Sequence, residues 1–75
     1  MTRKDFIEVV KNLNTDLRKN PDKWENNSLN DYLEAISRYT EEIQAFYDNT
    51  NQNINSEIPS WKIFADILKG ASIYE

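Results

Sequence analysis

Apolar residues recur at helical spacing in three separate stretches of the chain. In the first stretch they follow one another at intervals of four, three and four residues: Phe6, Val10, Leu13 and Leu17. Residues three and four apart are neighbours on a helix surface, so this spacing places them on one helical face. Thr2 and Asp5 have the spacing of a capping box at the start of a helix. The pattern predicts a helix over residues 3–19.

The second stretch carries the longest pattern of this kind. Its apolar and aromatic residues keep a three-four rhythm over about five helical turns: Leu29, Tyr32, Leu33, Ile36, Tyr39, Ile43, Phe46 and Tyr47. Ser28 and Asp31 again have capping-box spacing, which predicts a helix over residues 29–48. In the third stretch the repeating residues are Trp61, Phe64, Leu68 and Ala71. Pro59-Ser60 directly before them is a helix-start signal, so a third helix is expected over residues 60–73.

The segments between these helices favour turns. Asn20-Pro21 ends the first helix, because proline disfavours helical geometry in the residue before it, and a single helical turn is expected around Trp24. The connection over residues 48–57 is rich in asparagine, a turn-forming residue. With no alternating strand pattern, the sequence predicts an all-α fold: one domain over residues 1–75, a small antiparallel three-helix bundle with a short helical turn between helices one and two.

Large aromatic residues are expected to supply most of the core. A chain of 75 residues buries only about 60% of its unfolded surface, and without cysteine it has no disulfides to compensate. We therefore predict that Trp24 and Trp61 are both substantially buried. The tyrosines of helix two are expected on the margins of its apolar stripe: Tyr32, Tyr39 and Tyr47. Gly70, inside the third pattern, either weakens the last turn or allows close packing.

Charge is unevenly distributed along the acidic chain. Residues 1–24 carry six basic and four acidic residues, residues 25–60 carry one basic and seven acidic residues, and residues 61–75 carry two of each. Nucleic acid is a disfavoured partner, because phosphate binding requires clustered lysine and arginine that carboxylates do not dilute. No stretch approaches the roughly 20 apolar residues of a membrane span, so we expect no membrane association and a cytoplasmic location.

The commonest catalytic and metal-binding groups are absent. The sequence has no cysteine and no histidine, which excludes the usual nucleophile–base pairs and an ordinary structural zinc site. Glu41 and Glu42 are adjacent, and neighbouring residues on a helix do not face each other. The asparagine-rich segment fails the calcium-loop template, which would need glycine at Asn53 and glutamate at Pro59. We expect no enzyme activity, no metal and no cofactor.

Two blocks of the sequence carry a resemblance to known proteins. The first block comprises Trp24-Glu25-Asn26, Leu29 and Tyr32-Leu33-Glu34-Ala35. The second comprises Pro59-Ser60-Trp61, Phe64-Ala65, Leu68, Ala71 and Tyr74-Glu75. These blocks resemble a family of small bacterial domains of unknown function, over about residues 5–75. The resemblance implies a small, mostly helical bacterial domain, and it implies no activity, substrate or site.

Two groups of residues are candidates for binding a protein partner. The first is the set of acidic residues on helix two: Asp31, Glu34, Glu41, Glu42 and Asp48. A field of one sign attracts a basic partner, although solubility explains the same charges. The second is a possible edge of an aromatic pocket: Trp24, Glu25, Asn26, Trp61 and Tyr74. Core packing is the competing interpretation of both tryptophans.

Three functional hypotheses follow. The leading one is a non-enzymatic module that binds a protein partner, with a basic partner expected at the acidic residues. The alternatives are a self-associating structural protein and a small acidic immunity-type inhibitor of a basic toxin. The chain is expected to be a monomer or a weak homo-oligomer. The immunity-type alternative rests on analogy alone, since fold and charge do not specify function.

Overall fold

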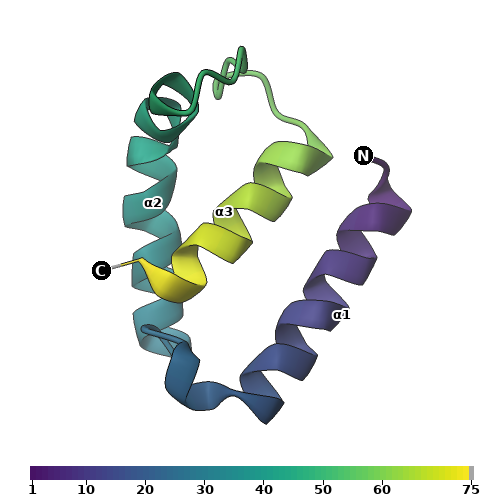
Figure 1. The fold of residues 1–75 in the computed structure, drawn as a ribbon, viewed down its shortest axis with the longest axis vertical. Coiled ribbons are helices and arrows are strands. Elements are labelled where there is room, and N and C mark those ends of the chain that lie inside the picture. The colour runs from purple at the N-terminus through teal and green to yellow at the C-terminus, as the bar shows by residue number, and fades with distance from the viewer. Residues whose placement is uncertain (75) are drawn as a thin grey trace.

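A computed structural model describes residues 1–74. Its elements, in chain order, are α1 (Arg3–Lys19), the short 3-10 helix η1 (Pro21–Lys23), α2 (Leu29–Asn49) and α3 (Trp61–Ile73). No strand occurs within these residues. Figure 1 shows α1 and α3 running in one direction and α2 in the other. The predicted all-α fold class, with three antiparallel helices and a helical turn at the corner, is confirmed.

Capping side chains set the start of each long helix. Thr2 and Asp5 form the predicted capping box: the Thr2 hydroxyl accepts from the Asp5 amide at 3.3 Å, and the Asp5 carboxylate accepts from the Thr2 amide at 2.9 Å. Ser28 and Ser60 cap α2 and α3 through one half of this arrangement, because each hydroxyl accepts from the amide three residues later at 3.2 Å. These bonds satisfy amides that have no partner inside the helix. The predicted helix boundaries agree with the observed ones to within one residue.

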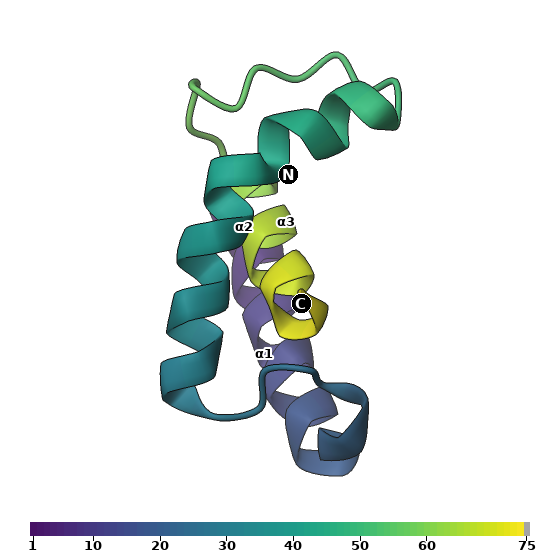
Figure 2. The ribbon, with the colours of Figure 1, turned by 90° about the vertical axis from the view of Figure 1, so that its left-hand side faces the viewer.

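The helix α3 lies between the other two (Figure 1) and packs against both of them. Figure 2 shows the 50–60 connection crossing one end of the molecule, while the corner between α1 and α2 lies at the other end. Because α3 separates them, α1 and α2 make little direct contact. The bundle therefore has a well-packed α2–α3 side and a more open side between α1 and α2.

The buried core lies where α2 meets α3. Its members are Ile43, Tyr47 and Ile63, against which Ile54 and Ile67 pack. Tyr47 is completely buried, so the prediction that it lies on the margin of the apolar stripe is wrong. Burial of a phenol requires a hydrogen-bond partner for its hydroxyl, and a carboxylate of α3 supplies one.

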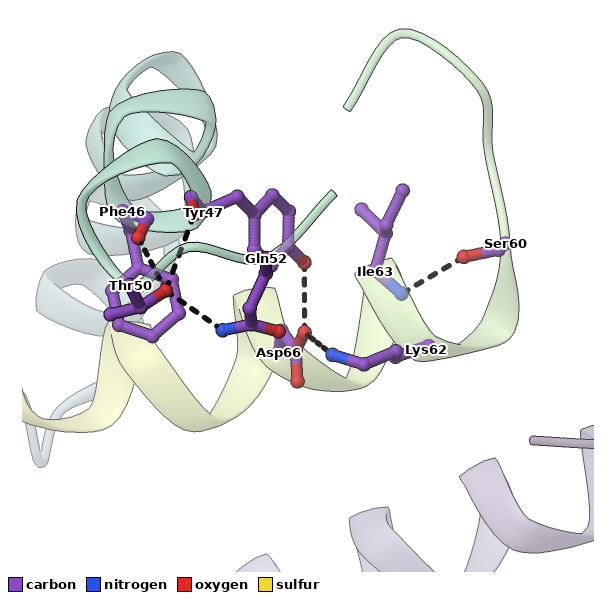
Figure 3. A network of polar contacts seen from close by, with 8 residues as sticks. All are labelled: Phe46, Tyr47, Thr50, Gln52, Ser60, Lys62, Ile63 and Asp66. Atoms are coloured by element: carbon purple, nitrogen blue, oxygen red, sulfur yellow. Dashed lines mark hydrogen bonds and ion pairs between the residues drawn. The ribbon is translucent and has the colours of Figure 1, made fainter. Parts of the chain in front are cut away.

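That carboxylate belongs to Asp66, at the centre of a small polar network (Figure 3). The Tyr47 hydroxyl donates to Asp66 at 2.8 Å, and the Lys62 ammonium donates to the same oxygen at 2.6 Å. The Lys62 nitrogen also lies 5.5 Å from the centre of the Tyr47 ring, within the range of a cation–π contact. The network satisfies the polar end of Tyr47 and joins α2 to α3.

The two tryptophans differ, contrary to the prediction that both are buried. Trp24 is 7% exposed and belongs to the core, whereas Trp61 is 39% exposed. Trp61 is the first residue of α3 and packs against Phe6 of α1 and Phe64 of its own helix. It stays exposed because it lies at the outer end of the α1–α3 contact, where no other helix covers it.

The apolar stripes of α1 and α2 are also less buried than their patterns predict. No residue of α1 is fully buried. On α2, three members of the predicted stripe are exposed: Leu29, Leu33 and Phe46. A three-helix arrangement with α3 in the middle covers only part of each outer helix, which leaves these side chains in contact with solvent.

Gly70 allows close packing between α3 and α2. A β-carbon at this position would lie 2.3 Å from two carbons of the Tyr39 ring, far inside van der Waals contact. The aromatic ring thus occupies the space that a larger residue would fill. This resolves the two interpretations of the glycine in favour of close packing.

Candidate functional site

An apolar groove of about 430 Å³ lies between α1, the corner and α2. Its apolar lining comes from all three helices and the corner: Val10, Leu13, Leu17, Trp24, Leu29, Tyr32 and Leu68. Its polar lining comes from three asparagines and the α2 cap: Asn14, Asn26, Asn27 and Ser28. Almost all of the exposed lining is apolar. We call this feature the α1–α2 groove.

Trp24 lines the groove at the corner between α1 and α2. Its indole nitrogen donates to Asp16 at 2.7 Å, and its ring packs on Tyr32 with 5.6 Å between the ring centres. The Tyr32 hydroxyl in turn donates to the backbone oxygen of Leu68 at 2.8 Å. This chain of contacts links α1, the corner, α2 and α3. The groove end is therefore held in a defined shape before any ligand arrives.

Asn26 fixes the corner to the end of α3. Its side-chain nitrogen donates to the backbone oxygens of Ala71 at 2.9 Å and Tyr74 at 2.6 Å. Its backbone amide donates to the oxygen of Ser72 at 3.2 Å. The last carbonyls of a helix lack hydrogen-bond donors inside the helix. Asn26 donates to two such carbonyls of α3, those of Ala71 and Ser72. The sequence predicts that Asn26 lies at a corner. Its hydrogen bonds to the end of α3 were not predicted, because the partners are 45 and 48 residues away along the chain.

Exposed apolar side chains extend the groove beyond its lining. On α2, the lining residue Leu29 is 73% exposed, and Leu33, one turn beyond the lining, is 54% exposed. Ile7 on α1 and Phe64 on α3 are also exposed, each one turn along the same helix from a lining residue. Adjoining apolar side chains left in water are typical of binding surfaces.

Two titratable groups in contact with Trp24, namely Asp16 and the lining residue Tyr32, already have structural partners. Hydrogen bonds from Trp24 and then Asn20 lower the pKa of Asp16. Burial raises the pKa of Tyr32, whose hydroxyl donates to a backbone oxygen. Both groups hold helices together, so the groove offers an apolar binding surface rather than an acid–base pair.

The acidic candidates of α2 are distributed over separate local contacts. Asp31 and Glu34 line a small polar hollow with Arg38 and Tyr74, and Glu34 is paired with Arg38. Two others accept hydrogen bonds: Glu42 from the Tyr74 hydroxyl at 2.7 Å, and Asp48 from Gln44 at 3.0 Å. The hydrogen bond to Glu42 raises the pKa of Tyr74. Glu41 is exposed.

The five residues of the candidate aromatic pocket do not share one cavity. Trp24 and Asn26 line the α1–α2 groove. Tyr74 lies with Asn26 at the separate polar hollow, and Glu25 is exposed. Trp61 packs against Phe6 and lies outside the groove lining. The structure thus retains one tryptophan and one asparagine of the predicted set as groove residues.

A second, shallower apolar hollow lies between α2 and α3. Its volume is about 280 Å³, and its lining includes Tyr39, Phe46, Lys69 and Ile73. The α1–α2 groove has none of these residues in its lining. The molecule therefore presents two distinct apolar surfaces.

Within residues 1–74 there is neither a cluster of metal ligands nor a membrane-spanning helix. No group of three or more acidic, histidine or cysteine side chains there is arranged to hold a metal ion. None of the helices in this part of the chain has the length and apolar character needed to cross a membrane.

Comparison with known protein families matches residues 2–75 to a family of unknown function, DUF7660. The chain belongs to this family. The match agrees with the resemblance to a family of unknown function and covers nearly the whole sequence. No curated protein and no solved structure matches this member of DUF7660.

Proposed function

We propose that this DUF7660 domain is a non-enzymatic protein-interaction module, and that the α1–α2 groove binds a helix of a partner protein. The observation that carries the proposal is the apolar groove itself, about 430 Å³ in volume and bordered by the exposed Leu29 and Leu33. An amphipathic helix that lays its apolar face into such a groove is a recurring mode of recognition.

The geometry favours a helix over a small substrate. The groove lies between the two outer helices, and Leu68 of α3 contributes to its lining. Its one ordered end is built from Trp24 and Asn26, whose polar atoms are engaged in the fold. A fourth helix lying over α3 would cover the faces of α1 and α2 that a three-helix fold leaves open.

Capture from the native host tests this function with a matched pair of variants. Leu29→Glu/Leu33→Glu places one charge in the groove lining and one a turn beyond it on α2. Ile58→Glu/Ile73→Glu places two charges at similarly exposed positions away from the groove, where Ile73 lines the second apolar hollow. Partners retained by wild type and by the Ile58/Ile73 variant should be lost from the Leu29/Leu33 variant. Circular dichroism should show the same helix content in all three. Equal capture by both variants would exclude the groove.

Self-association is a second candidate, favoured by the apolar hollow that contains Phe46 and Ile73. Two apolar surfaces at different places on one molecule permit head-to-tail contact between copies. Sedimentation velocity at several concentrations distinguishes the candidates, since self-association gives a sedimentation coefficient that rises with concentration. Ile73→Glu should abolish this rise.

A basic partner at the acidic residues of α2 remains a separate prediction, as do a bacterial, cytoplasmic setting and the immunity-type alternative. Charge reversal at Glu34, Glu41 and Glu42 should slow the association of such a partner and weaken its dependence on salt. Unchanged association in this triple variant would assign these charges to solubility.

A further inference from the structure

One border of the α1–α2 groove is positively charged. Lys4, Lys11 and Arg18 recur every seven residues on α1. Seven residues are about two helical turns, so the three side chains form one row along the helix. Asn14 lines the groove and stands between Lys11 and Arg18 at neighbouring helical positions. The row, which we call the basic row, therefore runs along the α1 border of the groove.

Contacts within the fold do not account for these charges. Lys11 has only a long ion pair with Glu8, 3.9 Å between exposed side chains, and such pairs stabilise little. Within residues 1–74, Lys4 and Arg18 have no carboxylate at ion-pair distance. The positive charge of Arg18, in the last turn of α1, interacts favourably with the helix dipole. The positive charge of Lys4, in the first turn, interacts unfavourably with it. Helix stability thus leaves the row as a whole unexplained.

The opposite border, on α2, is neutral on either side of Leu33, and its first acidic residue, Glu41, lies one turn beyond Ser37. The neighbours of Leu33 along the same face of α2 are Asn30, three residues before it, and Ser37, four residues after it. The acidic residues Asp31 and Glu34 line the separate polar hollow with Tyr74. The groove is consequently apolar inside, flanked along α1 by three basic residues with Glu8 between two of them, and neutral beside Leu33 on α2.

We propose that the occupant of the groove is an acidic amphipathic helix of a partner protein, with its acidic residues along the edge that faces the basic row. This inference rests on the proposed function and adds the charge class of the partner. Complementary charges at a rim accelerate encounter and select against wrong partners. A second copy of the chain docked through this same surface would add positive charge to the contact, because a two-fold interface uses the same patch twice.

A pair of synthetic peptides tests the charge class directly. Each peptide has about 18 residues, or five helical turns, with leucines at helical spacing. One peptide carries glutamates beside the leucine stripe, and the other carries lysines at the same positions. Binding to the 75-residue chain is followed by NMR, with the amide signals of Val10, Leu29 and Leu33 as reporters of the groove and of the α2 surface beside it. We expect the acidic peptide to bind at least about tenfold more tightly at low salt.

Charge-reversal variants make the test specific for the basic row. Lys11→Glu/Arg18→Glu should abolish or invert the preference for the acidic peptide. Lys19→Glu/Lys69→Glu makes the same change in net charge at exposed positions outside the groove lining and should retain it.

The possible failures are distinguishable. Equal binding of both peptides at the groove, or a preference unchanged in Lys11→Glu/Arg18→Glu, would overturn the acidic helix and leave the groove function standing. Absence of groove shifts with either peptide would overturn both. Sedimentation of the chain alone as a dimer that Leu33→Glu dissociates would identify a second copy as the occupant and overturn the acidic-helix inference.

Discussion

The contacts of α3 with α2 and with α1 differ in how completely they exclude water. On the α2 side, Ile43, Tyr47 and Ile63 are buried together, and a polar network joins the two helices. On the α1 side, the contact is made by half-buried residues, and α1 contributes no fully buried side chain. Both outer helices are amphipathic, so the sequence pattern alone does not reveal this difference.

The comparison indicates how a domain of this size divides stability and binding. Burial of apolar area supplies most of the favourable free energy of folding, which concentrates stability in the α2–α3 pair. The partly covered α1 leaves apolar surface free for a partner, and binding surfaces are commonly drawn from less stable parts of a fold. Trp24 and Asn26 prevent the open side from collapsing, because they fix the corner to α1 and α3.

The largest expected effect on the free energy of unfolding comes from an isoleucine-to-alanine substitution, made once on α2 and once on α1. Ile43→Ala should lower the free energy of unfolding by about 2–5 kcal/mol, because Ile43 is 1% exposed and its removal leaves a cavity. Ile7→Ala on α1 should cost less than about 1 kcal/mol, because that side chain is 44% exposed. Urea unfolding of the two variants measures both values. Equal losses would mean that α1 is as important to stability as the α2–α3 core.

A smaller effect tests the closeness of the α2–α3 contact. Gly70→Ala should destabilise the domain by about 1–2 kcal/mol, since overpacking against the Tyr39 ring outweighs the better helix propensity of alanine. In a Tyr39→Leu background the obstructing ring atoms are gone, and the same change should stabilise by up to about 1 kcal/mol. Thermal unfolding of the wild type, the two single variants and the double variant gives the coupling free energy between positions 39 and 70. Additive effects would contradict the close approach of Gly70 to the ring.

Helix positions and fold class could be predicted from the sequence because their signals are local. Capping residues such as Thr2, Ser28 and Ser60 act on amides three residues away. Apolar spacing shows which face of a helix is buried, and the two polar connections require neighbouring helices to be antiparallel. These features gave the helix boundaries to within one residue.

Burial of individual residues could not be predicted, because it depends on which helix lies in the middle. The apolar stripe of α2 contains both the buried Ile43 and the exposed Leu33, and no local signal separates them. Trp24 and Trp61 both stand beside helix starts, yet only Trp24 is covered by several elements. The groove forms from α1, the corner, α2 and α3 together, so its existence is a property of the tertiary arrangement.

The smallest expected effect concerns the alkaline stability of the α2–α3 side. Burial, and then the hydrogen bond to Asp66, raise the pKa of Tyr47 above its usual value of 10.0. Below pH 10 the phenol is protonated in both states and its contribution to stability is complete. Above pH 10 the unfolded chain ionises first, so the free energy of unfolding should fall by up to about 1.4 kcal/mol per pH unit through this group.

Tyr47→Phe isolates that contribution. At pH 7 the variant should lose only about 1 kcal/mol, because Asp66 keeps its partner Lys62. Between pH 10 and 11 its stability should decline less steeply than that of the wild type, since one titrating group has been removed. Tyr74→Phe is the matched control: its hydroxyl contacts the exposed Glu42, and its removal should change the slope less. Urea unfolding at a series of alkaline pH values measures the slopes. Parallel declines in wild type and Tyr47→Phe would show that the Tyr47 hydroxyl is ionised as readily in the folded chain as in the unfolded one, and that the α2–α3 side is open to water.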